Sequence, residues 1–348
     1  MKASFCYGSP WQKDAAAYMH SGSSMVPIKP YLAGLKMTQQ WLRKAELIVG
    51  DDAGNALDLS ALHITFSVHG ATTQTLKRAT VRVYNLAQDT INRVQREFTR
   101  FTLQAGYDGG IGQIFSGSIT KIKRGRENAT DSFLELEGAD GDEVYNWGVV
   151  STTLAAGWTY QDKISALAKA MESYGILMGV MPPLPSTKGP AGITMYGMVR
   201  DHLRQTADAI GCDWNIQDGR LNFIPKGGYL TSDAIVLSPS TGMVGVPELT
   251  MEGIVVKCLL NPNIKAGMRV QIENSYITDT VVKQPMQPNS QDIKMPTLDS
   301  RGVYKVLYVV NNGDTRGQTW YTEMICSAID GAAPLSGPAI NAVPEVTH

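Results

Sequence analysis

Cysteine and histidine side chains, the usual zinc ligands, are few and widely spaced in this sequence. The cysteines are Cys6, Cys212, Cys258 and Cys326, and no two of them form a C-x-x-C pair. Their spacing argues against both a zinc site and a disulfide framework. His63 and His69 fall on the polar side of one predicted strand, where we expect solvated side chains rather than metal ligands. The sequence therefore predicts no metal site and no cofactor.

A cluster of carboxylates could support sugar hydrolysis or calcium binding. Its members are Glu135, Glu137, Asp140, Asp142 and Glu143. Glycoside hydrolysis needs two carboxylates at a defined separation across a cleft, and the sequence does not fix such a geometry. The segment Asp140-Gly141-Asp142 also lacks the remaining ligands of a calcium loop. A strand end at a domain junction accounts for the cluster, and a carbohydrate-active enzyme stays as the alternative.

Basic side chains form one short run: Lys121, Lys123, Arg124 and Arg126. The polar face of a strand that enters a turn accounts for it. A contact with passing nucleic acid is the alternative, but the run has no interleaved aromatic residues for base stacking. The formal net charge of the chain is −1, so no strong positive field attracts nucleic acid or an anionic membrane. We expect no sequence-specific binding of nucleic acid.

Motifs that mark common catalytic sites are absent from the sequence. It contains no G-x-x-x-x-G-K-[ST], no G-x-G-x-x-G after a strand, no H-E-x-x-H and no G-x-S-x-G. We therefore expect no catalytic residues and a protein that is not an enzyme. No apolar run approaches the length of a membrane span either.

Hydrophobic periodicity predicts a chain built mainly from strands. The 348 residues, of which 43% are hydrophobic, suffice for two or three domains. Alternating residues such as Ile64, Phe66 and Val68, separated by short turns, predict antiparallel strands. One amphipathic helix is expected at 87–98, with an apolar face formed by Ile91, Val94 and Phe98. The expected fold class is α+β, mainly β, with two tube-like antiparallel β-barrel or sandwich domains and a small α/β domain between them.

The middle of the chain has a different pattern, with two helices and a hairpin. The helices are expected at 160–174, between the N-cap Thr159 and Gly175, and at 196–210. In the hairpin at 212–225, Asp218-Gly219 supplies the positive φ angles of a type I′ turn. The segment predicts a small α/β domain inserted between two β units.

Segments before and after this insertion match in length and in the position of their turns. The matched pairs are 112–141 with 302–331, 102–105 with 269–272, and 81–86 with 256–261. In the first pair, Leu134 and Leu136 correspond to Met324 and Cys326. Identity is low, and turn-punctuated alternation is common in antiparallel proteins. A repeated β unit and a chance likeness are therefore both open at this point.

Two segments of the second β unit carry a resemblance to a known family. Residues 258–270, CLLNPNIKAGMRV, resemble the "leucine-asparagine-proline … glycine-x-x-valine" segment of phage baseplate hub proteins. Residues 302–323, from Gly302 through Gly313-Asp314-Thr315-Arg316-Gly317 to Glu323, resemble the closing hairpin of the same proteins. The resemblance spans about 42–331. It implies the central hub of a long-tailed bacteriophage, contractile-tailed ones included, or of a related contractile injection system.

The resemblance also implies partners. Such hubs are trimers, and each subunit contributes two tube-like domains to a pseudo-sixfold ring. The ring would dock on the hexameric tail tube protein and receive the trimeric central spike or tail-tip protein, with tape measure and baseplate wedge proteins as further candidates. The implied role is a structural virion protein that forms part of the channel for DNA ejection. It would reside in the tail baseplate, and in the host cytoplasm during assembly. A receptor-binding module is a second alternative beside the enzyme.

The expected domains follow from these patterns. They are an N-terminal arm 1–41, a first tube-like domain 42–142, the α/β insertion 143–233, a second tube-like domain 234–331 and a mobile C-terminal tail 332–348. The arm either orders against a neighbour or is disordered. The polar segment 273–301 has no counterpart in the first unit. It is the candidate for a spike-facing loop, with a merely flexible surface loop as the alternative.

Overall fold

The computed structural model describes residues 42–51, 53–230, 233–250, 252–279, 298–299 and 301–329. The predicted arm 1–41, the predicted tail 332–348 and most of the predicted loop 273–301 lie outside these ranges. Over the described part, the chain is mainly β with four α-helices, which confirms the expected α+β, mainly β class.

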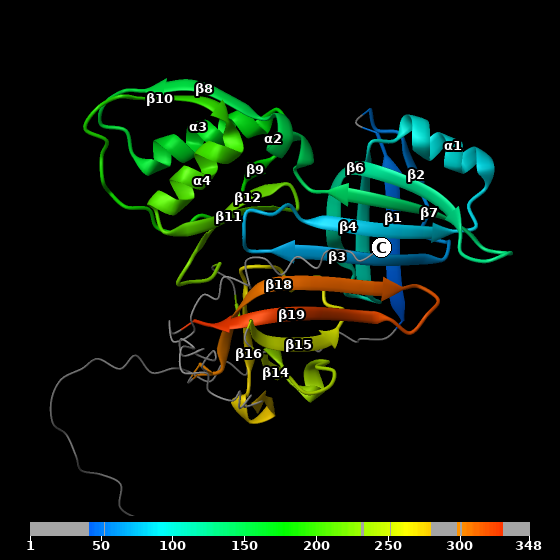
Figure 1. The fold of residues 1–348 in the computed structure, drawn as a ribbon. Coiled ribbons are helices and arrows are strands. Elements are labelled where there is room, and N and C mark those ends of the chain that lie inside the picture. The colour runs from blue at the N-terminus through cyan, green and yellow to red at the C-terminus, as the bar shows by residue number, and fades with distance from the viewer. Residues whose placement is uncertain are drawn as a thin grey trace, which may run out of the picture. The chain divides into compact units, whose positions relative to one another are not determined.

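The first β unit comprises seven strands and one helix (Figure 1). They are β1 (Arg43–Gly50), β2 (Ala56–Asp58), β3 (Ile64–Ala71), β4 (Arg78–Tyr84), α1 (Gln88–Glu97), β5 (Arg100–Tyr107), β6 (Gly112–Arg126) and β7 (Ser132–Ala139). Strand β3 alternates strictly between buried and half-buried side chains, as its sequence predicted. Helix α1 buries Ile91 and Val94, and Phe98 directly after it is buried as well. The apolar face predicted at 87–98 is confirmed.

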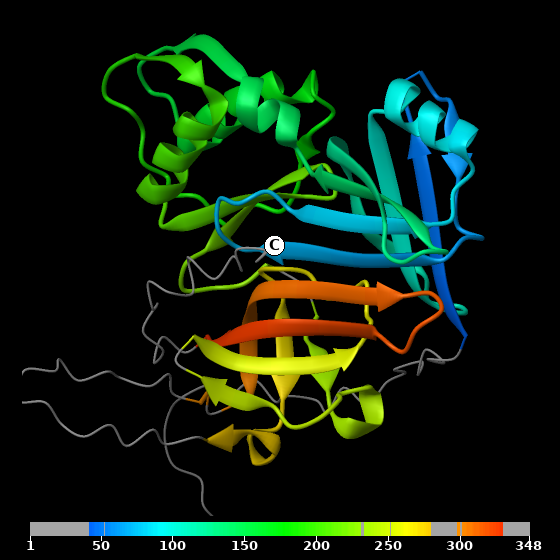
Figure 2. The ribbon, with the colours of Figure 1, turned by 45° about the vertical axis from the view of Figure 1, so that its right-hand side comes forward.

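The insertion follows with three helices and five strands. They are α2 (Asp142–Trp147), β8 (Val149–Leu154), α3 (Tyr160–Glu172), β9 (Leu177–Met178), β10 (Ile193–Met198), α4 (Val199–Ala209), β11 (Cys212–Gln217) and β12 (Arg220–Pro225). Figure 2 shows the same elements from a second direction. Among the described strands, β8 pairs only with β10, and β12 pairs with β11 and β9, which makes two small sheets.

Local sequence signals correctly predicted several helix ends and turns of the insertion. Thr159 and Asp162 form a capping box at the start of α3, and Gly175 after its end has a φ of +74°. Asp218 and Gly219 have φ angles of +55° and +70°, which confirms the type I′ turn. The predicted start of the second helix at 196 was wrong. Residues 193–198 are strand β10, because Gly197 has a φ of +134° and the segment pairs with β8.

The second β unit contains seven strands and two short 3₁₀ turns. They are β13 (Ile235–Leu237), η1 (Pro239–Thr241), β14 (Glu248–Thr250), β15 (Gly253–Leu259), β16 (Arg269–Ile272), η2 (Asn274–Tyr276), β17 (Thr278–Asp279), β18 (Val303–Asp314) and β19 (Trp320–Ala328). The strands of both β units belong to one continuous sheet with the order β17-β14-β15-β19-β18-β3-β4-β7-β6-β5-β1-β2. Strands β16 and β13 branch from it at β18.

Three clusters of buried apolar side chains form the interior of the described part. One lies among the strands of the first unit and α1, one within the insertion, and one within the second unit. The first cluster also contains Leu260 and Trp320, which belong to the second unit. Trp320 packs edge-on against Phe66, with ring centroids 5.5 Å apart. The two β units therefore share part of their core.

Candidate assembly surface

The two β units pair their strands in the same order. In the first unit, β6 lies between β5 and β7, and β7 lies between β6 and β4. In the second unit, β18 lies between β16 and β19, and β19 lies between β18 and β15. The segments matched in the sequence therefore occupy equivalent places in the two units.

The segments matched in the sequence are two residues out of register where β4–β7 is compared with β15–β19. Val81 lies opposite Leu136, whereas Val256 lies opposite Met324. The alignment had matched Val81 with Val256 but Leu136 with Cys326. A shift of two residues leaves every side chain on its own face, because strand side chains alternate with a period of two. The apolar pattern alone could not detect the error.

The long strands β6 and β18 each change their pairing near the middle of their length. Each strand has an irregularity near its middle, between Ile119 and Lys121 in β6 and between Val306 and Tyr308 in β18. Before this point, β6 pairs with β5 and β18 pairs with β16. Such bulges bend a strand and increase its twist, so one strand can leave one partner and continue along another.

A seam joins the two units where β18 continues along β3. The pairing runs antiparallel from Tyr308 opposite Ala71 to Asp314 opposite Thr65. Figure 1 shows β18 and β3 side by side at the centre of the sheet. Backbone hydrogen bonds between β18 and β3 thus join the two units into one sheet, although the whole insertion lies between them in the sequence.

Both strand histidines are part of this seam. His69 Nδ1 lies 2.6 Å from the Tyr308 hydroxyl, and His63 Nε2 lies 2.8 Å from the Asp314 carboxylate. The expectation of solvated histidines holds only in part, because both side chains are half-buried and bond to residues of β18. The sequence could not show which strand pairs with β3. Burial lowers the pKa of His69 and favours its neutral form. The Ser67 hydroxyl completes the seam with a hydrogen bond of 2.7 Å to Asn312.

The charged side chains of the sheet are largely paired across neighbouring strands. Glu135 accepts from the guanidinium of Arg82 at 2.6 Å, and Glu137 accepts from Lys121 at 3.0 Å. Lys123 lies 3.9 Å from Glu135, and Lys257 lies 2.8 Å from Glu323 in the second unit. The carboxylates Glu135 and Glu137 and the lysines of the basic run therefore neutralise one another.

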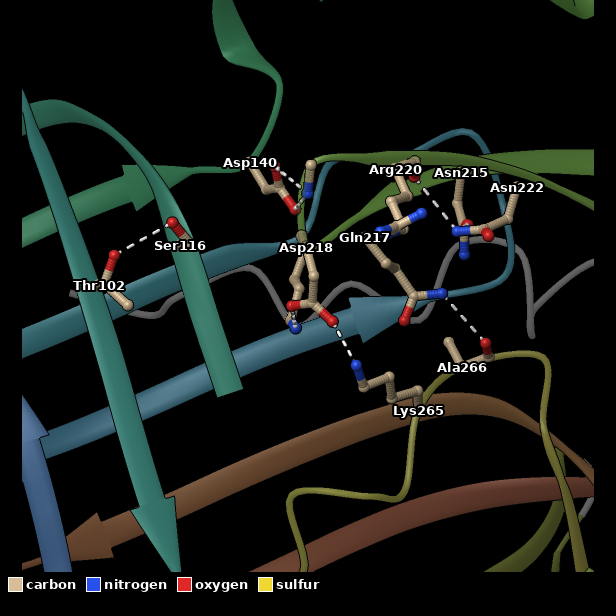
Figure 3. A network of polar contacts seen from close by, with 12 residues as sticks. Thr102, Ser116, Asp140, Asn215, Gln217, Asp218, Arg220, Asn222, Lys265 and Ala266 are labelled. Atoms are coloured by element: carbon tan, nitrogen blue, oxygen red, sulfur yellow. Dashed lines mark hydrogen bonds and ion pairs between the residues drawn. The ribbon is translucent and has the colours of Figure 1, made fainter. Parts of the chain in front are cut away.

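Asp218 is the centre of a buried polar junction among three parts of the chain (Figure 3). It lies in the β11–β12 turn of the insertion and accepts from Lys77, which precedes β4, at 2.8 Å. Its second oxygen accepts from Lys265 of the second unit. Burial opposes the ionisation of Asp218, but the charges of Lys77 and Lys265 outweigh it and lower its pKa. One turn carboxylate thus ties the insertion to both β units.

Asp140 faces the same turn from the end of β7. Its carboxylate accepts from the backbone N–H of Gly219 at 3.2 Å, and the side chain is almost fully buried. Burial raises the pKa of Asp140 to about 6. Asp142 and Glu143 lie instead in the first turn of α2. The acidic cluster is therefore divided among a sheet face, a buried junction and a helix start, and it does not form one site.

Buried amides add further anchors that sequence reasoning missed. Asn215 donates to the Ala71 carbonyl at 2.9 Å, and Gln217 donates to the Ala266 carbonyl at 3.0 Å. Asn222 donates to the Asn215 amide oxygen at 3.4 Å (Figure 3). The sequence did contain a signal for these contacts, namely amide side chains within a strongly apolar hairpin. Buried amides require hydrogen-bond partners, so such residues indicate contacts with other segments.

The residues that carried the family resemblance hold turns in place. Asn261 donates its backbone N–H to the Thr322 hydroxyl at 3.0 Å, and its amide oxygen accepts from the N–H of Asn263. Gly267 has a φ of +88°, and a β-carbon there would lie 2.8 Å from Ile224. Asp314 accepts from the N–H of Arg316 and of Gly317. These residues therefore hold the backbone in place, which is a structural role.

A pocket of about 240 Å³ lies at the seam beside the β3–β4 turn and α2. Among the described residues, its lining contains one carboxylate, that of Asp142, together with Arg78, His69, Tyr308 and Tyr145. A carboxylate pair of the kind used by glycosidases is therefore not present in this pocket. The pocket gives no support to the carbohydrate-active alternative.

Metal-binding clusters are not found among the described residues. No group of three or more His, Cys, Asp or Glu side chains in the described ranges could hold a metal ion. Cys258 and Cys326 are buried, and burial raises the pKa of Cys258 to about 12, so both behave as small apolar residues. Within the same ranges, no helix combines the length and the apolar character needed to cross a membrane.

Comparison with known proteins relates this fold to phage tails. No protein-family model matches the sequence, and no curated protein matches it. The solved structures that align with it include the 43 kDa tail protein of prophage MuSo2 from Shewanella oneidensis and the tail protein from Neisseria meningitidis MC58. Both give a TM-score of 0.52 and cover 84% of this chain and 98% of their own, at 7% and 12% identity. The chain shares its fold with these tail proteins. The resemblance seen in the sequence is therefore confirmed at the level of the fold.

Proposed function

We propose that this chain is a structural protein of a phage tail and forms the trimeric hub of its baseplate. The observation that carries the proposal is the pair of β units with one strand order, joined edge to edge by β3 and β18. A trimer of such chains would present six similar units in a ring. That symmetry suits docking on a hexameric tail tube, while the differences between the units suit a trimeric spike. The fold of two tail proteins supports the same role.

We propose that the expected domain boundaries follow the three cores. The first tube-like domain would be 42–142, the insertion 143–233 and the second tube-like domain 234–331. Leu260 and Trp320 of the second unit lie in the core of the first, so these two domains would behave as one rigid body. The insertion has its own core and no counterpart elsewhere in the described chain, so it would lie outside the ring.

The differences between the two β units would supply the threefold features. The first unit connects β4 to β5 through helix α1, whereas a short loop connects β15 to β16 in the second. The proposed spike-facing segment 273–301 falls mostly outside the described residues, and its described beginning forms η2 and β17. The ring would surround the channel for DNA ejection, in the virion baseplate, after assembly in the host cytoplasm.

An enzymatic role is the weaker candidate. Two members of the acidic cluster are ion-paired on the sheet, and Asp140 hydrogen-bonds the Gly219 backbone. A carboxylate that acts as acid or nucleophile must instead reach the substrate. A receptor-binding module has no specific observation in its favour.

The mass of the protein in solution tests the proposal directly. Light scattering after size exclusion should give three times the chain mass of 37.8 kDa. Electron microscopy of the protein mixed with its tail tube and spike proteins should then place it between the two. A monomer at all accessible concentrations, or a trimer that binds neither protein, would overturn the hub assignment.

A further inference from the structure

Lys77 and Asp218 are a buried pair of side chains that can react with each other. Lys77 Nζ lies 2.8 Å from Asp218 Oδ1, and both side chains are largely buried. An amine and a carboxyl group can condense to an amide with loss of one water molecule. In bulk water the ionised and solvated forms of both groups prevent this reaction. Burial removes that solvation and holds the two groups together, as the condensation requires.

The protons of this pair can move without any outside partner. Lys77 donates one hydrogen bond to Asp218, so transfer of that proton leaves a neutral amine beside a neutral carboxylic acid. Although burial opposes ionisation, the charges of Lys77 and Lys265 lower the pKa of Asp218, so the ion pair is the main form. The neutral pair is a minor form, and the condensation would therefore be slow and would follow folding. Freshly folded protein then holds the ion pair that the structure shows.

Lys265 supplies a positive charge where negative charge would develop during the reaction. It donates to Asp218 Oδ2, the oxygen that Lys77 does not contact (Figure 3). When the Lys77 amine adds to the carboxyl carbon, Oδ2 becomes an oxyanion, and an ammonium group already placed against it stabilises this state. Lys265 is also the more exposed of the two lysines, at 39% against 7% for Lys77. The buried Lys77 is therefore assigned as the nucleophile.

Asp140 supplies an acid at the same turn. Its carboxylate accepts from the backbone N–H of Gly219, the residue after Asp218, and its side chain is almost fully buried. Burial raises the pKa of Asp140 to about 6, and the charges of Lys77 and Asp218 also act on it. Below this pH, Asp140 is a neutral acid that can protonate a departing oxygen and then take up a proton from the new amide nitrogen.

We propose that Lys77 and Asp218 condense to an isopeptide bond after the chain has folded. The bond between Lys77 Nζ and Asp218 Cγ forms, the bond between Cγ and Oδ1 breaks, and Oδ1 leaves as water. Both protons of this water come from the Lys77 ammonium, one directly and one by way of Asp140, which returns to its starting state. No group is oxidised or reduced. The product ties the first β unit covalently to the insertion, whichever role the protein has in the tail.

Mass spectrometry of the intact chain during prolonged incubation tests the bond. The wild type should become one water molecule lighter, faster near pH 5 than near pH 8, because Asp140 holds its proton only at the lower pH. Digestion with trypsin should then yield the peptides containing Lys77 and Asp218 joined to each other. Lys77→Arg keeps a cation but has no amine to react, so its mass should stay constant. Asp140→Asn should slow the loss of water by about a hundredfold or more.

Lys44 and Asp108 are the matched control pair within the same chain. Their Nζ and Oδ1 atoms are 2.6 Å apart, but both side chains are 54% exposed. No linkage should form between them, and Lys44→Arg should lose water as the wild type does. A wild-type mass that stays constant overturns the proposal. Loss of water without joined peptides would indicate a succinimide at Asp218-Gly219 and overturns it as well, as does linkage of Asp218 through Lys265 or an equally fast linkage of Lys44 to Asp108.

Discussion

Lys77 Nζ lies 2.8 Å from the Asp218 carboxylate, which joins the first β unit to the inserted domain. The two side chains are only 7% and 14% exposed. Lys265 of the second unit binds the other oxygen of the same carboxylate. A single residue of a hairpin turn therefore holds three parts of the chain together.

Asp218→Asn should destabilise the protein strongly. Asparagine tolerates the left-handed backbone of this turn, so the change removes the charge without straining the chain. It leaves the buried Lys77 ammonium without its counter-charge, which typically costs about 3–5 kcal/mol. Urea unfolding followed by circular dichroism measures the loss.

Asp108→Asn is the control for that measurement. Asp108 pairs with Lys44 on the surface, where both side chains are 54% exposed. Exposed pairs contribute about 0–1 kcal/mol, so this variant should unfold nearly as the wild type does. Equal effects of the two variants would show that the Asp218 junction is not a buried anchor.

The pKa of Asp140 predicts a specific dependence of stability on pH. Burial raises this pKa from 3.8 to about 6, so between these values the folded state holds a proton that the unfolded state has released. Stability therefore falls as the pH rises through this window, by about 3 kcal/mol in total at about 1.4 kcal/mol per pKa unit. The lowered pKa of Asp218 acts in the opposite direction, since its contribution is lost as the pH falls.

Asp140→Asn isolates the first effect. The amide oxygen can still accept from the N–H of Gly219, but the side chain no longer ionises. The variant should match the wild type near pH 4 and exceed its free energy of unfolding near pH 7.5. Chemical denaturation at a series of pH values gives the difference curve. A difference that stays constant from pH 4 to pH 7.5 would contradict the assigned burial.

Local signals in the sequence were sufficient where one segment decides its own structure. The capping box at Thr159, the Asp218-Gly219 turn and the apolar face of α1 depend on neighbours within a few residues. The helix expected from 196 failed because Gly197 and pairing with β8 override the apolar spacing. The matched segments indicated that the two β units are built alike. The two-residue error in matching them could not be seen in the sequence, because it leaves every side chain on the same face.

Contacts between distant segments could not be predicted from the sequence. His63 and His69 bond to side chains of β18, the strand that pairs with β3. His63 and Asp314 are 251 residues apart in the sequence, so no local pattern indicates that they meet. The same limit applied to the acidic cluster, since the partners of Glu135 and Asp140 come from other strands and from the insertion. Periodicity reports which face is buried, and it does not report against what.

The protein should not hydrolyse peptidoglycan. Glu137 is ion-paired with Lys121, and Asp142 is the single carboxylate of the seam pocket. A zymogram with host cell walls should therefore show no clearing for the wild type, with a muramidase run alongside as the positive control. Clearing that disappears in Glu137→Gln or Asp142→Asn would establish the enzymatic alternative.

Trp214 should be a principal support of the inserted domain. Its side chain is 1% exposed and belongs to the buried cluster formed by α2, α3, α4 and the β11–β12 hairpin, near Tyr145. Trp214→Ala should lower the free energy of unfolding by about 3–5 kcal/mol, because it removes a large buried side chain and leaves a cavity. Trp147→Ala changes the same residue type in the same domain at a site that is 73% exposed, so its effect should stay within about 0.5 kcal/mol.

The proposal that the insertion lies outside the ring adds a second readout: Trp214→Ala should leave the trimer mass unchanged while the insertion becomes sensitive to protease. Loss of the trimer in Trp214→Ala would instead place the insertion within the ring contacts.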